Sequence, residues 1–155
     1  MLSDDDIVRV RCGWAAAAVD PDRTAAAFYS HLFRVAPEAR ALFQEDMTVQ
    51  RRKLAQTLDT IVDALDAPDR LLPIARQLAR RHVAYGVRPE HYDAVGAALQ
   101  AALGDLLGST FTPADRLAWS RVYEALSTEM REAAYPAGAS GGPGGPDPAP
   151  GNTAR

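Results

Sequence analysis

Apolar residues recur at the three- and four-residue spacing of an α-helix along most of the chain, with proline or glycine between the periodic runs. No segment alternates apolar and polar residues between turn signals, as a half-buried strand would. The pattern therefore predicts an all-α protein with six substantial helices and one short helical segment. We expect the first helix at about residues 4–19, a second that begins at Pro21, and the short segment from Pro37 to Phe43. The next two helices are expected from Met47 to the break at Ala67-Pro68 and over residues 69–85. The last two are expected from Pro89 to Gly108 and from Thr112-Pro113 onward.

The last part of the chain differs from the rest in composition. Of the 11 glycines and 11 prolines, half fall within residues 136–155, and this segment has no large apolar side chain. It cannot bury enough apolar surface to offset the entropy lost on ordering. We expect one folded domain over residues 1–135 and a disordered Gly/Pro-rich tail over residues 136–155.

Charge and cysteine content exclude several classes of function. The net charge of −3 gives no global attraction to nucleic acid or to an anionic membrane, and no apolar run is long enough to span a bilayer. Cys12 is the only cysteine, which excludes an internal disulfide and a multi-thiolate metal site. The acidic N-terminus does not resemble a signal peptide, so a cytoplasmic location is expected.

Two polar residues lie on helix faces that are otherwise apolar. Gln50 lies one turn before Leu54 on its stripe, and His82 continues the stripe of the next predicted helix. With one helix break between them, the two residues can lie on opposite walls of a slot. Tyr29, from a third helix, and Phe43, from the short connecting segment, can complete it. Such a slot suits a flat apolar cofactor with His82 as metal ligand, although a lone histidine on an apolar face is more often an ordinary core residue. His31 and His91 are expected at the surface.

Three stretches in the same order resemble the globin family, specifically the single-domain bacterial haemoglobins and the globin module of flavohaemoglobins. Residues 28–43, FYSHLFRVAPEARALF, resemble that family's second and third helices, and residues 46–54, DMTVQRRKL, resemble the start of its distal helix. Residues 79–96, ARRHVAYGVRPEHYDAVG, resemble its proximal-histidine segment. The likeness runs from about residue 14 to 130 and implies a globin fold of about six to eight helices enclosing haem b (iron protoporphyrin IX).

The resemblance implies a role for each matching residue. His82 corresponds to the axial ligand of the haem iron, with its other ring nitrogen oriented by a carbonyl or carboxylate. Tyr29 and Gln50 correspond to the distal pair, Phe43 to a residue that packs on the porphyrin, and Leu54 to the apolar residue above the iron. Other residues that match haem-lining positions are Leu58, Leu78, Val87, Tyr92 and Val95. From their spacing in the sequence, Lys53 or Arg51 could reach a propionate group of the haem.

The implied function is reversible, high-affinity binding of oxygen and other diatomic gases. The Tyr29 O–H and the Gln50 N–H can both donate to a ligand that accumulates negative charge. In the resembled family the held oxygen often reacts with nitric oxide to give nitrate. Flavohaemoglobins carry a reductase domain for this purpose, so this chain is expected to need a separate flavin or NAD(P)H-dependent reductase.

One departure from the flavohaemoglobin pattern concerns the last helix. Alignment on Trp119 and Tyr123 puts Ala134 where that family has a glutamate near the proximal histidine, and Glu132 is expected to point elsewhere. This weakens the dioxygenase interpretation. Two alternatives stay open: a haem-based gas or redox sensor that acts through a partner protein, and a haem-free helical interaction module.

Overall fold

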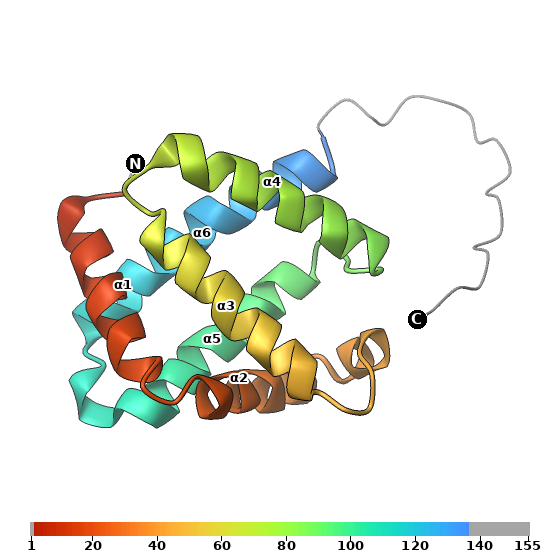
Figure 1. Ribbon diagram of the computed structural model, residues 1–155, viewed down its shortest axis with the longest axis horizontal. Helices are drawn as coiled ribbons and strands as arrows, with labels where there is room; N and C mark the ends of the chain where they lie inside the picture. Colours follow the sequence, from red (N-terminus) through yellow and green to blue (C-terminus); the bar gives the residue numbers. More distant parts are fainter. Residues whose placement is uncertain (1, 137–155) are drawn as a thin grey trace, which may run out of the picture.

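The computed structural model describes residues 2–136, and the expected tail therefore lies almost entirely outside the described residues. The described part consists of six α-helices and two short 3-10 helices, without a strand, which confirms the all-α prediction (Figure 1). The elements are α1 (Asp4–Ala17), α2 (Pro21–Val35), η1 (Pro37–Leu42), α3 (Thr48–Asp63), α4 (Pro68–Ala84), α5 (His91–Leu107), η2 (Gly108–Thr110) and α6 (Pro113–Ala134).

Most helices begin where the local sequence satisfies their free N–H groups. Ser3 and Thr112 each form a capping box, with Asp6 and Asp115 respectively. Proline occupies the first turn of α2, η1, α4 and α6, where its missing N–H costs nothing. At the other end of α4, Gly86 adopts a φ of +87°, the left-handed conformation that commonly follows a helix.

The end of α3 differs from the sequence-based expectation. The helix ends at Asp63 rather than running on to Ala67-Pro68. Arg11 of α1 donates hydrogen bonds to two carbonyl oxygens of the last turn, 3.3 Å to Val62 and 3.1 Å to Asp63. These bonds satisfy carbonyl groups that the next helical turn would otherwise use. The helix end is therefore set by a contact from another part of the chain.

The start of α5 also differs. The helix begins at His91, two residues after the proline expected to open it. The imidazole Nδ1 of His91 accepts the backbone N–H of Arg88 at 3.0 Å, and the backbone N–H of His91 donates to the Arg88 carbonyl, also at 3.0 Å. Pro89 therefore lies in a hydrogen-bonded turn that leads into the helix.

The main hydrophobic core lies between α1, α2, α5 and α6. It includes Val10, Trp14, Phe28 and Leu103, which are almost fully buried. A second cluster joins α4 to α6 and contains the buried side chains Ala75, Ala79, Tyr92 and Met130. The small alanines allow the backbones of α4 and α6 to approach closely.

α3 and α4 are consecutive helices, but they diverge from their connection at residues 64–67 (Figure 1). α3 packs against α2 and α1, and α4 packs against α6, whereas the two helices make little direct contact with each other. The start of α3 and the end of α4 consequently lie apart from each other in the fold.

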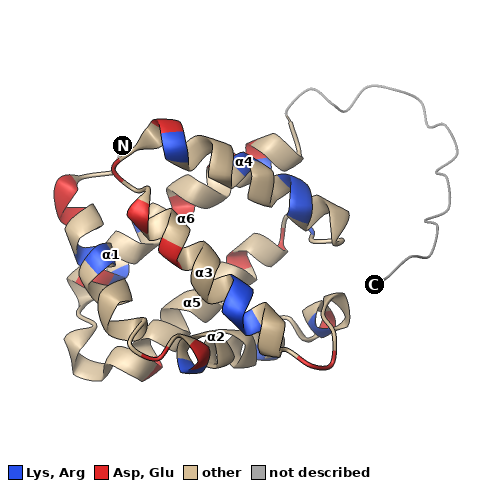
Figure 2. Ribbon diagram, in the orientation of Figure 1, with Lys and Arg blue, Asp and Glu red and all other residues tan. Residues whose placement is uncertain are grey.

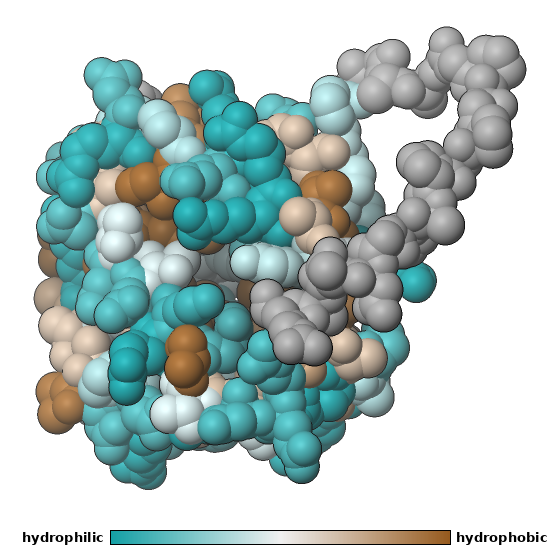
Figure 3. All heavy atoms as spheres, turned by 45° about the vertical axis from the view of Figure 1, so that its right-hand side comes forward, coloured by the Kyte–Doolittle hydropathy of each residue, from teal (hydrophilic) through white to brown (hydrophobic). Residues whose placement is uncertain are grey.

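Polar side chains cover the outside of the bundle. Charged residues of both signs occur on α1, α2, α3, α4 and α6, whereas α5 carries only the acidic Asp93 and Asp105 (Figure 2). Hydrophilic side chains predominate on the face shown in Figure 3. Within residues 2–136, no helix combines the length and the hydropathy needed to cross a membrane.

Candidate functional site

Tyr29 of α2 and Gln50 of α3 are in direct contact. The side-chain N–H of Gln50 donates a hydrogen bond of 2.9 Å to the hydroxyl oxygen of Tyr29. Tyr29 is buried, and burial raises the pKa of its hydroxyl, with the Gln50 hydrogen bond acting in the opposite direction. The hydroxyl is therefore protonated at neutral pH. Because its oxygen accepts from Gln50, its own proton is free to serve a third group.

Aromatic rings surround the Tyr29 side chain. The Phe43 ring meets the Tyr29 ring edge-on with 5.3 Å between centroids, and the Phe33 ring stacks on Tyr29 at 5.8 Å. Phe28 lies 5.0 Å away in another edge-to-face contact. These rings fix the direction of the hydroxyl and lower the local polarity, which strengthens any hydrogen bond that it makes.

His82 of α4 has a defined tautomer. Its Nδ1 lies 2.6 Å from the carbonyl oxygen of Leu78, one turn earlier. A carbonyl oxygen only accepts, so Nδ1 carries a proton, and in the neutral imidazole this leaves the lone pair on Nε2. This neutral form, held by a backbone carbonyl, is the form in which histidine binds a metal ion. His82 is half-buried.

Tyr92 of α5 lies beside His82, with 6.4 Å between ring centroids. Its hydroxyl is buried and has no hydrogen-bond partner among the described residues. The guanidinium of Arg131 lies 5.4 Å from the centre of its ring, and Ala134 packs against the same cluster. Glu132 is exposed, and no carboxylate of α6 is a hydrogen-bond partner of this hydroxyl.

The remaining predicted residues provide apolar walls. Leu54 and Leu58 of α3, Leu78 of α4 and Val95 of α5 are only partly buried, and they pack against the edge of the main core. Val87 packs against the second cluster. Partly exposed apolar side chains thus lie on α5 and on α3 and α4, and the last two helices make little direct contact with each other. With the free Nε2 of His82, this arrangement fits a flat apolar metallocofactor such as haem.

The predicted residues form two groups. One contains Tyr29, Gln50 and Phe43, and the other contains Leu78, His82 and Tyr92. Lys53 lies apart from both and is exposed. Arg51, the other residue offered to a propionate, forms an ion pair of 2.8 Å with Asp22, which leaves Lys53 as the freer of the two cations.

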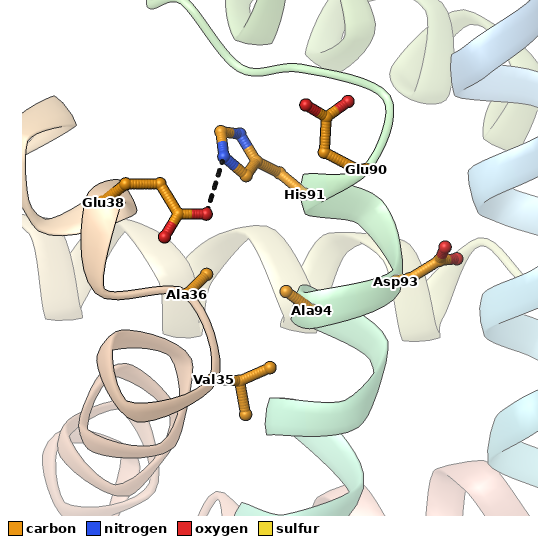
Figure 4. Close-up of a pocket in the computed structure, with 7 residues that line it drawn as sticks. All are labelled: Val35, Ala36, Glu38, Glu90, His91, Asp93 and Ala94. Atoms are coloured by element: carbon orange, nitrogen blue, oxygen red, sulfur yellow. Dashed lines mark ion pairs between the residues drawn. The ribbon is translucent and has the colours of Figure 1, made fainter.

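The expectation that His91 is exposed was wrong. His91 is 8% exposed and lies under η1, with its Nε2 3.7 Å from the carboxylate of Glu38 (Figure 4). It lines a cavity of about 360 Å³ together with residues that do not belong to the predicted site: Val35, Ala36, Glu38, Glu90, Asp93 and Ala94. The partner that buries His91 is distant in sequence, so the local pattern gave no signal for it. His31 is half-buried, and its Nε2 contacts Asp105 at 2.5 Å.

Comparison with known proteins shows the family of the chain. The Globin family profile matches residues 26–130. A flavohemoprotein of Rhodopirellula baltica is 32% identical over 130 residues, which are 82% of this chain and 32% of that protein. A flavohemoprotein of Bordetella bronchiseptica is 34% identical over 123 residues, or 76% of this chain and 31% of that protein. The chain thus spans about a third of the length of these relatives.

Solved structures show the same fold. An engineered carbene transferase derived from a putative nitric oxide dioxygenase of Rhodothermus marinus superposes with a TM-score of 0.77 at 28% identity, covering 86% of this chain and 94% of that one. A bacterial globin from Campylobacter jejuni superposes with a TM-score of 0.75 at 21% identity, covering 85% and 96% respectively. The chain therefore belongs to the globin family, and this membership implies that it binds haem.

Proposed function

We propose that this globin binds haem b through Nε2 of His82 and holds oxygen reversibly and tightly beside Tyr29. The observation that carries the proposal is the hydrogen bond from Gln50 to the Tyr29 hydroxyl. Gln50 donates to the oxygen of this hydroxyl, so the O–H remains available to donate to a bound gas.

When bound, haem would supply an iron atom that binds diatomic gases, and His82 would hold it through Nε2. The chain's own residues determine how the haem and the gas are held. The Leu78 carbonyl fixes the His82 ring so that Nε2 presents its lone pair. Leu54 and Phe43 shield the distal side from water. The Tyr29 O–H would donate a hydrogen bond to the gas and stabilise the negative charge that bound oxygen acquires.

The size of the effect follows from this hydrogen bond. A hydrogen bond to a charged group contributes roughly 1.5–3 kcal/mol. Because about 1.4 kcal/mol corresponds to tenfold, one such bond slows oxygen release by roughly ten- to a hundredfold. Slow release is unsuited to rapid delivery and better suited to scavenging or to chemistry on the held gas.

Nitric oxide dioxygenation is the second candidate. Nitric oxide, oxygen and one electron give nitrate, and the Rhodothermus marinus relative is described as a putative nitric oxide dioxygenase. The Tyr29 donor favours this activity. The hydroxyl of Tyr92 has no hydrogen-bond partner within residues 2–136, and so no carboxylate partner there, which favours simple oxygen binding. Turnover would draw its electrons from a separate flavin or NAD(P)H-dependent reductase.

Absorption spectra of the purified protein test the proposal. The ferric, dithionite-reduced and then oxygen-exposed forms are compared. We expect a strong Soret band and two visible bands that appear on oxygenation. Absence of a Soret band after haem is supplied would refute haem binding and leave the helical interaction module. A Soret band without an oxygenated spectrum would favour the sensor or redox alternative.

A further inference from the structure

The loop of residues 43–47 joins η1 to the start of α3 (Figure 1), and its first half is held by the side chain of Arg40 in η1. The Nη1 group of Arg40 donates to the carbonyl oxygens of Phe43 at 3.4 Å and Gln44 at 2.9 Å. The Nη2 group donates to the carbonyl oxygen of Glu45 at 3.2 Å. Three consecutive carbonyl groups of the loop therefore converge on one guanidinium.

Arg40 fixes the backbone of Phe43 on both sides of its Cα atom. The N–H of Phe43 donates to the Arg40 carbonyl oxygen at 3.2 Å, and the carbonyl oxygen of Phe43 accepts from the Arg40 guanidinium. These two bonds set the direction in which the Phe43 side chain leaves the backbone. The Phe43 ring extends from this point to meet the ring of Tyr29 edge-on, with 5.3 Å between centroids.

The same guanidinium contacts a second ring beside Tyr29. Its central carbon lies 5.3 Å from the centre of the Phe33 ring, a cation–π arrangement. Phe33 in turn stacks on Tyr29 at 5.8 Å and packs against Phe43 at 5.6 Å. Of the rings around Tyr29, Arg40 therefore contacts Phe33 directly and holds Phe43 through its backbone.

Ion pairing does not account for the placement of Arg40. The side chain is half-buried and forms no ion pair within residues 2–136, although acidic residues lie near it in the sequence (Glu38, Glu45 and Asp46). A planar guanidinium can donate in several directions and stack on an aromatic ring at the same time, whereas a lysine ammonium lacks this fork. The contacts of Arg40 use both of these properties.

We propose that Arg40 is a positioning residue for gas binding, an inference that rests on the proposed function. By holding Phe43 and Phe33 against Tyr29, it keeps the Tyr29 hydroxyl directed at the bound gas. Hydrogen bonds weaken steeply when their angle departs from the preferred range. Release of the two rings would let the Tyr29 ring turn and would weaken its bond to the gas. Arg40 thus acts only through Tyr29.

A double-mutant cycle in the oxygen dissociation rate tests whether Arg40 acts through Tyr29. Arg40→Met keeps a long unbranched side chain and removes the guanidinium. In the haem-loaded full chain it should raise the rate about three- to tenfold, measured by stopped-flow displacement with carbon monoxide. In the Tyr29→Phe background it should change the rate by less than about twofold, because no hydroxyl remains to be directed. Equal factors in the two backgrounds would overturn the proposal.

Arg11→Met is the matched control. Arg11 is also a half-buried arginine that donates to two consecutive carbonyl oxygens, those of Val62 and Asp63 at the end of α3. Its removal should leave the oxygen dissociation rate within about twofold of wild type, and a rise equal to that of Arg40→Met would contradict a specific role. Arg40→Lys keeps the charge without the fork, so it should resemble Arg40→Met and replaces that variant if it does not fold.

The infrared C–O stretching band of the carbon monoxide complex gives a signature that does not depend on a rate. A hydrogen-bond donor beside the ligand stabilises negative charge on its oxygen and lowers this frequency. Arg40→Met should therefore add a second band at the higher frequency found in Tyr29→Phe, whereas Arg11→Met should show the wild-type band alone. A single unchanged band in Arg40→Met would contradict the positioning role.

Hydrogen–deuterium exchange separates this proposal from the proposed function, because it requires no haem. In the full chain as purified, the Phe43 amide donates to the Arg40 carbonyl oxygen. By NMR, this amide should exchange at least about fivefold faster in Arg40→Met than in wild type or Arg11→Met. If the protein takes up no haem, the proposed function fails, and this rate still decides whether Arg40 holds the loop. An unchanged rate would overturn the proposal.

Discussion

The Gln50 side-chain N–H donates to the Tyr29 hydroxyl oxygen across 2.9 Å, and this hydrogen bond joins α3 to α2 at the candidate distal pocket. Its direction matters more than its length. An amide that donates to a phenol leaves the phenol proton available, whereas a backbone carbonyl partner would have consumed it. Gln50 therefore acts through Tyr29, and the two residues should contribute unequally to gas binding.

Gln50→Leu should raise the oxygen dissociation rate by roughly two- to tenfold, because a neutral hydrogen bond contributes about 0.5–1.5 kcal/mol. Stopped-flow displacement of oxygen by carbon monoxide measures this rate. Gln56→Leu, an exposed glutamine on the same helix, is the control and should leave the rate unchanged. A larger effect for Gln50→Leu than for Tyr29→Phe would mean that Gln50 is the principal donor.

His82→Ala should abolish the normal haem spectrum, because no other side chain is proposed to supply the axial nitrogen. Free imidazole added to this variant should restore the spectrum by occupying the vacated space. His31→Ala, which removes a histidine paired with Asp105, should bind haem normally. Retention of an unchanged Soret band in His82→Ala would refute the assignment of the ligand.

Tyr92, which is buried, and Tyr123, which is half-buried, should respond differently to removal of their hydroxyls. The Tyr123 hydroxyl donates to the backbone carbonyl of Tyr92, whereas the Tyr92 hydroxyl has no partner within residues 2–136. Tyr123→Phe should lower the free energy of unfolding by about 0.5–1.5 kcal/mol, and Tyr92→Phe should be neutral or stabilising. Urea denaturation at the same haem loading measures both values. A destabilised Tyr92→Phe would reveal a partner for that hydroxyl.

Stability should fall at alkaline pH. Burial raises the pKa of Tyr29, Tyr92 and Tyr123 above the ordinary tyrosine value of about 10. The unfolded chain releases these protons near pH 10, while the folded chain retains them to higher pH. The free energy of unfolding should therefore receive a constant contribution from these groups below pH 10 and decrease above it. Urea denaturation between pH 8 and pH 11 checks this, and stability that increases over that range would contradict it.

Much of the fold was predictable because helix starts depend on neighbouring residues. The Ser3 and Thr112 caps are local signals, and so is the glycine after α4. The end of α3 was predicted incorrectly because Arg11, far away in sequence, satisfies its last carbonyls. The burial of His91 was missed for the same reason, since Glu38 and η1 cover it.

In the candidate site, too, the features with a local sequence signal were predictable and those that depend on distant residues were not. Polar residues on apolar stripes singled out Gln50 and His82, and the structure gives each a defined hydrogen bond. The sequence did not reveal the direction of the bond to Tyr29, the absence of a partner for the Tyr92 hydroxyl, or the pairing of Arg51 with Asp22. Each of these depends on helices that meet only in the folded chain.

The oxygen dissociation rate of Tyr29→Phe tests the central claim most directly. This substitution keeps the ring and its aromatic contacts and removes only the hydroxyl that accepts from Gln50. We predict that the rate rises at least about tenfold, while the carbon monoxide rate changes much less because that ligand carries less charge. An unchanged oxygen rate, with haem still bound, would contradict the account.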